Sequence, residues 1–320
     1  EDGTIHMTND GNGIDVAQHP EYNLWIPEMI FGHLRTSTNY DEKKKEKTVG
    51  GKNGFGFKLV LIWSTWGRVE TVDHVRGLKY IQEFKNNLTE IGKPSITKSK
   101  VKPYTKVSFK PDYTRLGISG LSEDMLSLFK KRVYDVSAVT DKTVKVKLNG
   151  QLVPCKNFEQ YIDLYVGSKT DTKRVYEQTD PRWEYAVCLA PNDEFQQVSF
   201  VNGIYTSKGG KHVEYIMNQI IRKLCVYIKQ KKKVDVKPNT IKEQLMLFLR
   251  CDIENPSFNS QTKDELGTAV PKFGSSCTVS DGFIEKIAKM GVMNAACALT
   301  QVKEDKVAKK TDGSKSKSIR

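Results

Sequence analysis

The sequence lacks the features of membrane, zinc and disulfide-rich proteins. No apolar run approaches the roughly 18 residues of a membrane span, and the acidic opening EDGTIHMTND does not resemble a signal peptide. The six cysteines include no CxxC pair, and the five histidines show no ligand spacing such as HxxxH. We therefore expect no membrane association, no bound metal on histidine or cysteine, and free thiols in a reducing compartment.

Positive charge is in excess. The 320 residues include 51 Lys and Arg against 38 Asp and Glu, a net charge of +13. With 38% hydrophobic and 28% charged residues, the chain is typical of a globular protein long enough for two domains. The charge is concentrated in KQKKK, 229–233, and in the tail 303–320. Such runs suit a polyanionic partner, but a solvated surface explains them equally simply.

Four glycines occupy the seven positions from Gly50 to Gly56, directly before an apolar stretch. Glycines at this density allow close approach to backbone N–H groups, which favours phosphate binding. The loop is not a Walker A motif, because Phe57 stands where that motif requires lysine. It is not a Rossmann fingerprint either, because Leu59 occupies the position of the third glycine. A phosphate loop and a tight turn before a helix both remain open at this point.

Hydrophobic periodicity predicts a mixed α/β chain. Alternating stretches predict strands in GTIHMTND, GRVETVD, KYIQEFK, TKVSFKP, WEYAVCLAP and FQQVSFVNGIYT. Helices are predicted in WIPEMIFGHL, in LSEDMLSLFKKRVYDVSAV with Ser122 as N-cap, and from about Lys211 to Lys231. The apolar stretch after Gly56 is too short to assign from its period, but the preceding glycine loop favours a helix there. Asn149-Gly150 predicts a hairpin, and a βαβ crossover is expected in the second half.

Several motifs then occur in one order. The turn NDGNGI follows the first strand, RTSTNY precedes the glycine loop, and FVNGIYTSKGGKH and ENPSFNSQTK lie downstream. Together they resemble the ATPase region of eukaryotic-type DNA topoisomerase II, within the GHKL superfamily. The turn NDGNGI alone would indicate only the GHKL superfamily, whereas the longer motifs narrow the resemblance to one family within it. The resemblance extends to about Thr300.

The resemblance implies a Bergerat-type ATP site, in which a glycine loop holds phosphates without a Walker lysine. Asn9 matches the residue whose amide, both donor and acceptor, contacts the adenine side of ATP. The matches to the segment that binds sugar and phosphates are Ser37, Thr38 and Asn39. The matches to the loop around the β- and γ-phosphates are Gly51, Lys52, Asn53, Gly54, Phe55, Gly56, Phe57 and Lys58.

The resemblance also implies a second, transducer domain that senses the nucleotide and contacts DNA. Gln261, Thr262 and Lys263 match its loop that reaches the γ-phosphate, so that hydrolysis can change an interdomain angle. The positions that match the family's DNA-contacting basic segment are Lys229, Gln230, Lys231, Lys232 and Lys233. Lysines there fit sequence-independent phosphate binding.

Some family features are changed or missing. Phe57 replaces the alanine before the loop's last lysine, and Asp15 replaces a proline. The family's catalytic glutamate and the asparagine that holds Mg²⁺ are expected upstream of residue 1, and its DNA-cleavage residues beyond Arg320. We therefore expect a fragment with no catalytic residue and no metal ligand of its own.

The sequence thus predicts a GHKL ATP-binding sandwich at 1–168, a transducer domain with a mixed sheet and a long helix at 169–302, and a basic linker at 303–320. The predicted function is the ATP-operated gate of a type II DNA topoisomerase, with ATP, Mg²⁺, double-stranded DNA and a second copy of the chain as partners. A nuclear location is expected for a cellular source and a replication compartment or virion for a viral one. Another GHKL ATPase and a nonenzymatic DNA-binding module are the alternatives.

Overall fold

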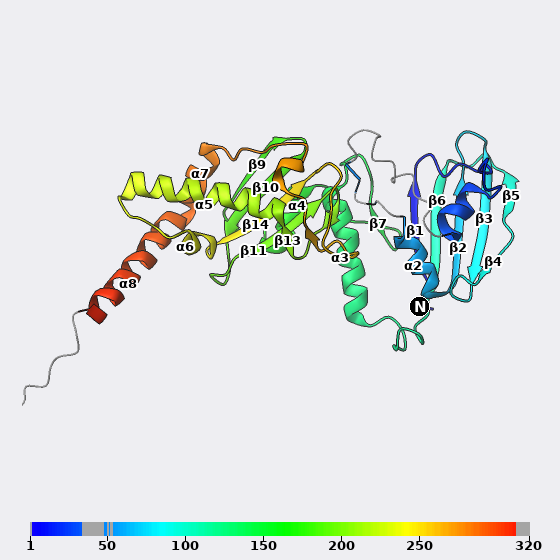
Figure 1. Ribbon diagram of the computed structural model, residues 1–320, viewed down its shortest axis with the longest axis horizontal. Coiled ribbons are helices and arrows are strands. Elements are labelled where there is room, and N and C mark those ends of the chain that lie inside the picture. Colours follow the sequence, from blue (N-terminus) through cyan, green and yellow to red (C-terminus); the bar gives the residue numbers. More distant parts are fainter. Residues whose placement is uncertain (1, 34–47, 50, 52–53, 312–320) are drawn as a thin grey trace, which may run out of the picture. The chain divides into compact units, whose positions relative to one another are not determined.

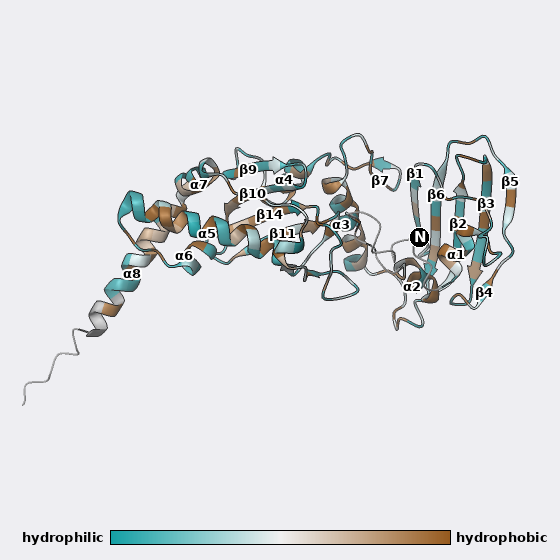
Figure 2. Cartoon of the chain, turned by 45° about the horizontal axis from the view of Figure 1, so that its top comes forward, coloured by the Kyte–Doolittle hydropathy of each residue, from teal (hydrophilic) through white to brown (hydrophobic). Residues whose placement is uncertain are grey.

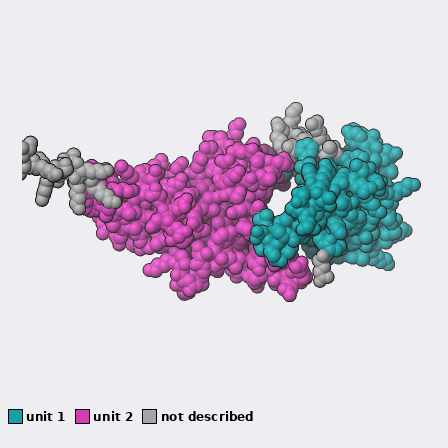
Figure 3. Space-filling model, turned by 90° about the horizontal axis from the view of Figure 1, so that it is seen from below, with its two compact units in different colours: residues 1–45, 51–128 teal, residues 46–50, 129–320 magenta. Residues whose placement is uncertain are grey.

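The computed structural model describes residues 2–33, 48–49, 51 and 54–311. The chain divides into two compact units, the first covering residues 1–45 and 51–128 and the second residues 46–50 and 129–320 (Figure 3). The chain passes from the first unit to the second within helix α3 (Glu123–Val139). Each unit has its own hydrophobic core.

The first unit is a twisted antiparallel sheet with two short helices on one face. Strands β1, β6, β2, β3 and β4 lie in that order, and β5 also pairs with β3 (Figure 1). Helices α1 (Ile26–Gly32) and α2 (Gly56–Ile62) contribute Phe31 and Leu61 to a core completed by Val69 and Phe84 of the sheet. The strand bounds are β1 Ile5–Asp10, β2 Ser64–Val72, β3 Leu78–Lys85, β4 Glu90–Ile91, β5 Ser95–Lys98 and β6 Tyr104–Pro111.

The second unit is built on a mixed five-stranded sheet in the order β12-β11-β14-β10-β9. Strands β11 and β14 are parallel, as the predicted crossover requires, and the long helix between them is α5. The strand bounds are β9 Arg174–Asp180, β10 Trp183–Leu189, β11 Gln196–Val201, β12 Ile204–Tyr205 and β14 Leu245–Cys251. Small pairs are formed by β7 Lys147–Leu148 with β8 Gln151–Leu152, and by β13 Gly209–Gly210 with β15 Glu265–Leu266.

Both faces of this sheet are covered, which explains the continuous apolar runs of its central strands (Figure 2). In β10, Tyr185 and Val187 face a core to which helices α5, α7 and α8 contribute. Ala186 and Cys188 face the opposite core, to which helices α3 and α4 contribute. The remaining helical bounds are α4 Phe158–Val166, α5 Lys211–Lys232, α6 Pro238–Lys242, η2 Val270–Lys272, α7 Asp281–Ile287, η3 Ala288–Val292 and α8 Met293–Thr311.

The predicted secondary structure is confirmed in its main elements. The strands predicted in the first half are β1, β2, β3 and β6, the hairpin turns at Asn149-Gly150, and the backbone N–H of Met125 donates to the Ser122 hydroxyl at 3.2 Å. No described helix is long and apolar enough to cross a membrane. The helices predicted after Gly56 and from Lys211 are α2 and α5.

Two segments lie next to the expected domain boundaries. Residues 129–166 pack on the second unit, because Phe158 and Tyr161 of α4 contact Phe200 of its sheet. The tail predicted as a linker is helical as far as Thr311, since its Lys, Glu and Ala residues favour helix and continue from the buried start of α8. The functional boundaries at 168 and 302 stay a prediction.

Candidate functional site

Asn9 lies near the end of edge strand β1, with its side chain exposed. In the sheet it stands opposite Thr105 of β6, which in turn stands opposite Thr71 of β2. The two threonine hydroxyls are 3.0 Å apart and form a buried polar pair. The Asn9 amide donates to the Asp10 carbonyl at 3.4 Å, a long contact. The amide is thus placed beside a polar patch of the sheet.

The glycine turn after β1 is fixed tightly against the end of β2. Gly13 has a φ of +73°, and a Cβ at this position would lie 1.9 Å from the carbonyl oxygen of Val72. The next residue, Ile14, donates its backbone N–H to the Thr71 hydroxyl at 2.9 Å. Only glycine fits such an approach, so the predicted turn has a clear steric reason.

Asp73 holds the far side of the same turn. Its buried carboxylate accepts hydrogen bonds from the backbone N–H of Val16 at 2.9 Å and from the Arg76 guanidinium at 2.7 Å. Burial alone would raise the pKa of this carboxyl, but these bonds and those from the Val75 and Arg76 amides outweigh it and lower the pKa to about 2. Asp73 is therefore an ionised clamp under the turn that follows Asn9.

The glycine loop leads into helix α2, as predicted. Gly54 has a φ of +64°, which favours glycine. Gly51 and Gly56 have open space where a Cβ would be, at least among the described residues, and neither has a positive φ. The predicted residues Ser37, Thr38, Asn39, Lys52 and Asn53 lie outside the described residues.

The two residues after Gly56 face inward. Phe57 makes edge-to-face contacts with Phe31 and Phe109, with ring centroids 5.2 and 5.9 Å apart. The replacement of the family's alanine is thus absorbed by the core of the first unit. Lys58 is also buried, 1% exposed, and desolvation lowers the pKa of its ammonium group.

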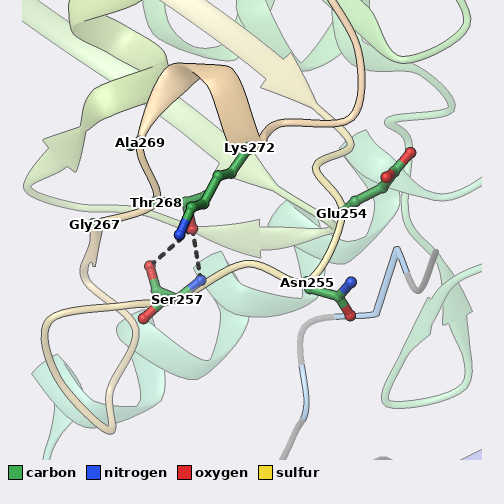
Figure 4. Close-up of a pocket in the computed structure, with 7 residues that line it drawn as sticks. All are labelled: Glu254, Asn255, Ser257, Gly267, Thr268, Ala269 and Lys272. Carbon is green, nitrogen blue, oxygen red and sulfur yellow. Dashed lines mark hydrogen bonds between the residues drawn. The ribbon is translucent and has the colours of Figure 1, made fainter. Parts of the chain in front are cut away.

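The segment that carries Gln261, Thr262 and Lys263 is a closed loop of the second unit. At its base, the Ser257 carbonyl accepts a hydrogen bond from the Gly267 amide at 2.9 Å. The Ser257 amide donates to the Thr268 hydroxyl at 2.7 Å (Figure 4). At its tip, Lys263 has a φ of +60° and donates its amide to the Ser260 carbonyl at 3.1 Å. Gln261 and Thr262 are exposed, Lys263 is half-buried, and desolvation lowers the pKa of the lysine.

The basic run Lys229–Lys233 forms the last turn and C-cap of α5, and all its residues are exposed. Lys229 pairs with Asp235 at 2.9 Å, and the Lys231 ammonium lies 5.9 Å from the centre of the Tyr227 ring. Lys233 ends the helix with a φ of +58°. Cations near a helix C-terminus stabilise the helix through its dipole. The basic run can therefore be explained by helix stability as well as by the expected DNA contact.

The structure brings Asn9 and the glycine loop into one unit and the loop of Lys263 and the basic run into the other. Among the described residues, no group of three His, Cys, Asp or Glu side chains could hold a metal. Sequence reasoning missed Thr71, Thr105 and Asp73. No local pattern distinguishes the two threonines, because β2 and β6 carry other polar residues such as Arg68 and Lys106.

Comparison with known proteins gives consistent likenesses. The DNA gyrase B family model matches residues 157–315. The chain is 42% identical to DNA topoisomerase 2 of Saccharomyces cerevisiae over 336 residues, which is 100% of this chain and 23% of the yeast protein. It is 44% identical to DNA topoisomerase 2 of Acanthamoeba polyphaga mimivirus over 315 residues, 97% of this chain and 25% of that protein.

Solved structures give the same result. The ATPase region of Saccharomyces cerevisiae topoisomerase II matches with a TM-score of 0.87 at 42% identity, over 93% of this chain and 78% of that one. The ATPase and transducer domains of DNA topoisomerase II from Balamuthia mandrillaris match with a TM-score of 0.89 at 36% identity, over 95% and 78%. The predicted fold class and resemblance are confirmed. The chain spans only 20–25% of the length of the curated relatives it matches.

Proposed function

Because the chain belongs to the DNA topoisomerase II family, we propose that it is the ATP-operated gate of a type II topoisomerase. Such an enzyme passes one DNA duplex through a transient double-strand break in another. In this proposal ATP joins two copies of the chain around the DNA to be passed, and hydrolysis later reopens them.

The observation that carries the proposal is the likeness to the ATPase region of Saccharomyces cerevisiae topoisomerase II, at 42% identity and a TM-score of 0.87 over 93% of this chain. In the part of the loop that the structure describes, Gly54 takes a positive φ of +64° just before helix α2. Glycines in such a loop let another group approach the backbone closely. Phosphate oxygens, bound by backbone N–H groups, are the natural candidate.

The chain's own residues would divide the work of binding ATP. The Asn9 amide can donate to and accept from the edge of a purine, with the Thr71–Thr105 hydroxyls beside it. The backbone of the glycine loop would hold the phosphates. Lys263, carried by the second unit, would contact the γ-phosphate and so register whether hydrolysis has occurred.

Mg²⁺ is the second proposed cofactor, as the family resemblance implies. In the described part of the chain, no group of three His, Cys, Asp or Glu side chains could hold the ion.

DNA and location follow from the same proposal. The exposed lysines of 229–233 would contact phosphates of the captured duplex, which needs no base recognition. The relatives described above come from a eukaryote and a virus. We propose a nuclear location for a cellular source, and a replication compartment or virion for a viral one.

DNA retention tests the proposal. A full-length topoisomerase II containing this chain is incubated with circular or linear DNA and a nonhydrolysable ATP analogue, then washed at high salt. We expect circular DNA to be retained only with the analogue, and linear DNA to slide free. Retention that ignores nucleotide would instead indicate a simple DNA-binding module.

A further inference from the structure

The loop that carries Lys263 rests on a short segment that precedes helix α5. Its strand β15 pairs in parallel with β13, so that Gly209 stands beside Glu265 and Gly210 beside Leu266. The Lys208 amide donates to the carbonyl of Asp264 at 3.0 Å, one residue from Lys263. The tip of the loop is thus positioned by residues 208–210.

Glycine is required in this segment. A Cβ on Gly210 would lie 2.4 Å from the carbonyl oxygen of Leu266, and the φ of Gly210 is +131°. The two strands therefore approach more closely than side chains allow. A displacement of the glycine segment has to move the loop with it, because no side chain separates them.

Thr206 anchors this segment to the sheet. The residue is fully buried, and its carbonyl accepts the Gly209 amide at 3.0 Å, which closes the turn before β13. Its hydroxyl lies 3.0 Å from the Ser199 carbonyl, 2.6 Å from the Ser199 hydroxyl and 3.1 Å from Nε2 of His212. Thr206 thus joins strand β11 to the first turn of α5 through its hydroxyl, and holds the glycine turn through its carbonyl.

The partners of this hydroxyl, Ser199 and His212, are shielded from water. His212 is fully buried, and desolvation lowers the pKa of its imidazole to about 3, so the ring is neutral at physiological pH. The preceding residue, Tyr205, packs against α3, where the Lys131 ammonium lies 3.7 Å from the ring centre. Because these groups are buried, water cannot replace the Thr206 hydroxyl, and its removal would leave Nε2 of His212 without this partner.

We infer that Thr206 is a positioning residue for Lys263. Its hydroxyl, bonded to Ser199 and His212, fixes the Gly209–Gly210 segment, and this segment holds the loop that carries Lys263 in place. The geometric part stands on this structure alone. Its consequence for ATP turnover rests on the proposed function.

Hydrogen exchange on the 320-residue chain tests the geometry. Thr206→Val removes the hydroxyl and keeps the shape, and Thr206→Ser keeps the hydroxyl. Thr300→Val is the matched control, because it removes a buried hydroxyl of the same unit whose bond, to Ala296, is local to α8. We expect amides of residues 257–268 to exchange at least about fivefold faster in Thr206→Val, with both other variants close to the unchanged chain.

Two outcomes would overturn the inference. One is unchanged exchange of residues 257–268 in Thr206→Val, and the other is faster exchange spread equally over β10 and β14. Should that variant not fold, Ser199→Ala removes one partner of the hydroxyl and must give the same pattern at smaller size.

ATP kinetics then separates the inference from the proposed function. In a full-length topoisomerase II containing this chain, Thr206→Val should lower kcat for DNA-stimulated ATP hydrolysis about tenfold, with KM nearly unchanged and with rescue by Thr206→Ser. Faster hydrogen exchange of residues 257–268 with an unchanged kcat would support the positioning role of Thr206 and refute the sensing role of Lys263. A lowered kcat with unchanged exchange of these residues would refute the positioning role.

Discussion

Protonation of Asp73 should loosen the glycine turn that follows Asn9. Hydrogen bonds depress the pKa of Asp73 from 3.8 to about 2 in spite of its burial, and nearly two pKa units correspond to about 2 kcal/mol. Because the folded-state pKa is the lower one, this stability is fully present above about pH 4 and is lost as the pH falls towards 2.

The substitution Asp73→Asn should lower the free energy of unfolding of the first unit by about 2 kcal/mol at pH 7. The difference from the unchanged chain should fall to roughly half at pH 3. Urea unfolding followed by tryptophan fluorescence measures it, since Trp25, Trp63 and Trp66 report on this unit.

Asp15→Asn is the matched control for this experiment. Asp15 is an exposed carboxylate that pairs with the same Arg76 at 3.5 Å, so its loss should cost less than about 1 kcal/mol. A difference for Asp73→Asn that is as small as the control, or that does not change between pH 7 and pH 3, would refute the reasoning.

Three further substitutions test other parts of the account. Gly13→Ala should destabilise the first unit by about 3 kcal/mol, because its Cβ would collide with the Val72 carbonyl at a positive φ, and a melting temperature lowered by less than a degree would contradict this. Phe57→Ala should cost about 2 kcal/mol in urea unfolding without tighter nucleotide binding, whereas a clear gain in affinity would show that the ring obstructs the phosphates. Replacing the lysines of 229–233 by Gln should weaken DNA binding similarly for all sequences and reduce its salt dependence, and an unchanged slope of log K against log salt would exclude the run as a DNA contact.

Much of the fold could be predicted because local patterns agreed with the final packing. The alternation in VETV and the stripe in IMNQIIRKLCVYI reflect surfaces that are half-buried in β2 and in α5. The split near Leu128 was not predicted, since it depends on where the aromatic side chains of α4 find partners 40 residues further on. Packing across such distances leaves no local pattern.

The candidate site was predicted only in part. The roles of Asn9 and the glycine loop are predicted by resemblance and stay a prediction, and the structure adds why Gly13 must be glycine. The clamp by Asp73 was missed because an aspartate at the end of a strand looks like an ordinary turn residue. The place of Phe57 in the core could not be predicted, since its partners come from a helix and a strand far apart in the sequence.

The central claim is that the second unit senses the nucleotide through Lys263. The most direct measurement is DNA-stimulated ATP hydrolysis by a full-length topoisomerase II containing this chain, compared with its Lys263→Ala variant. Lys272→Ala serves as control, because Lys272 is an exposed lysine near the base of the same loop. We predict that kcat falls at least about 100-fold in Lys263→Ala and stays within about twofold in the control. Equal turnover in both variants would contradict the account.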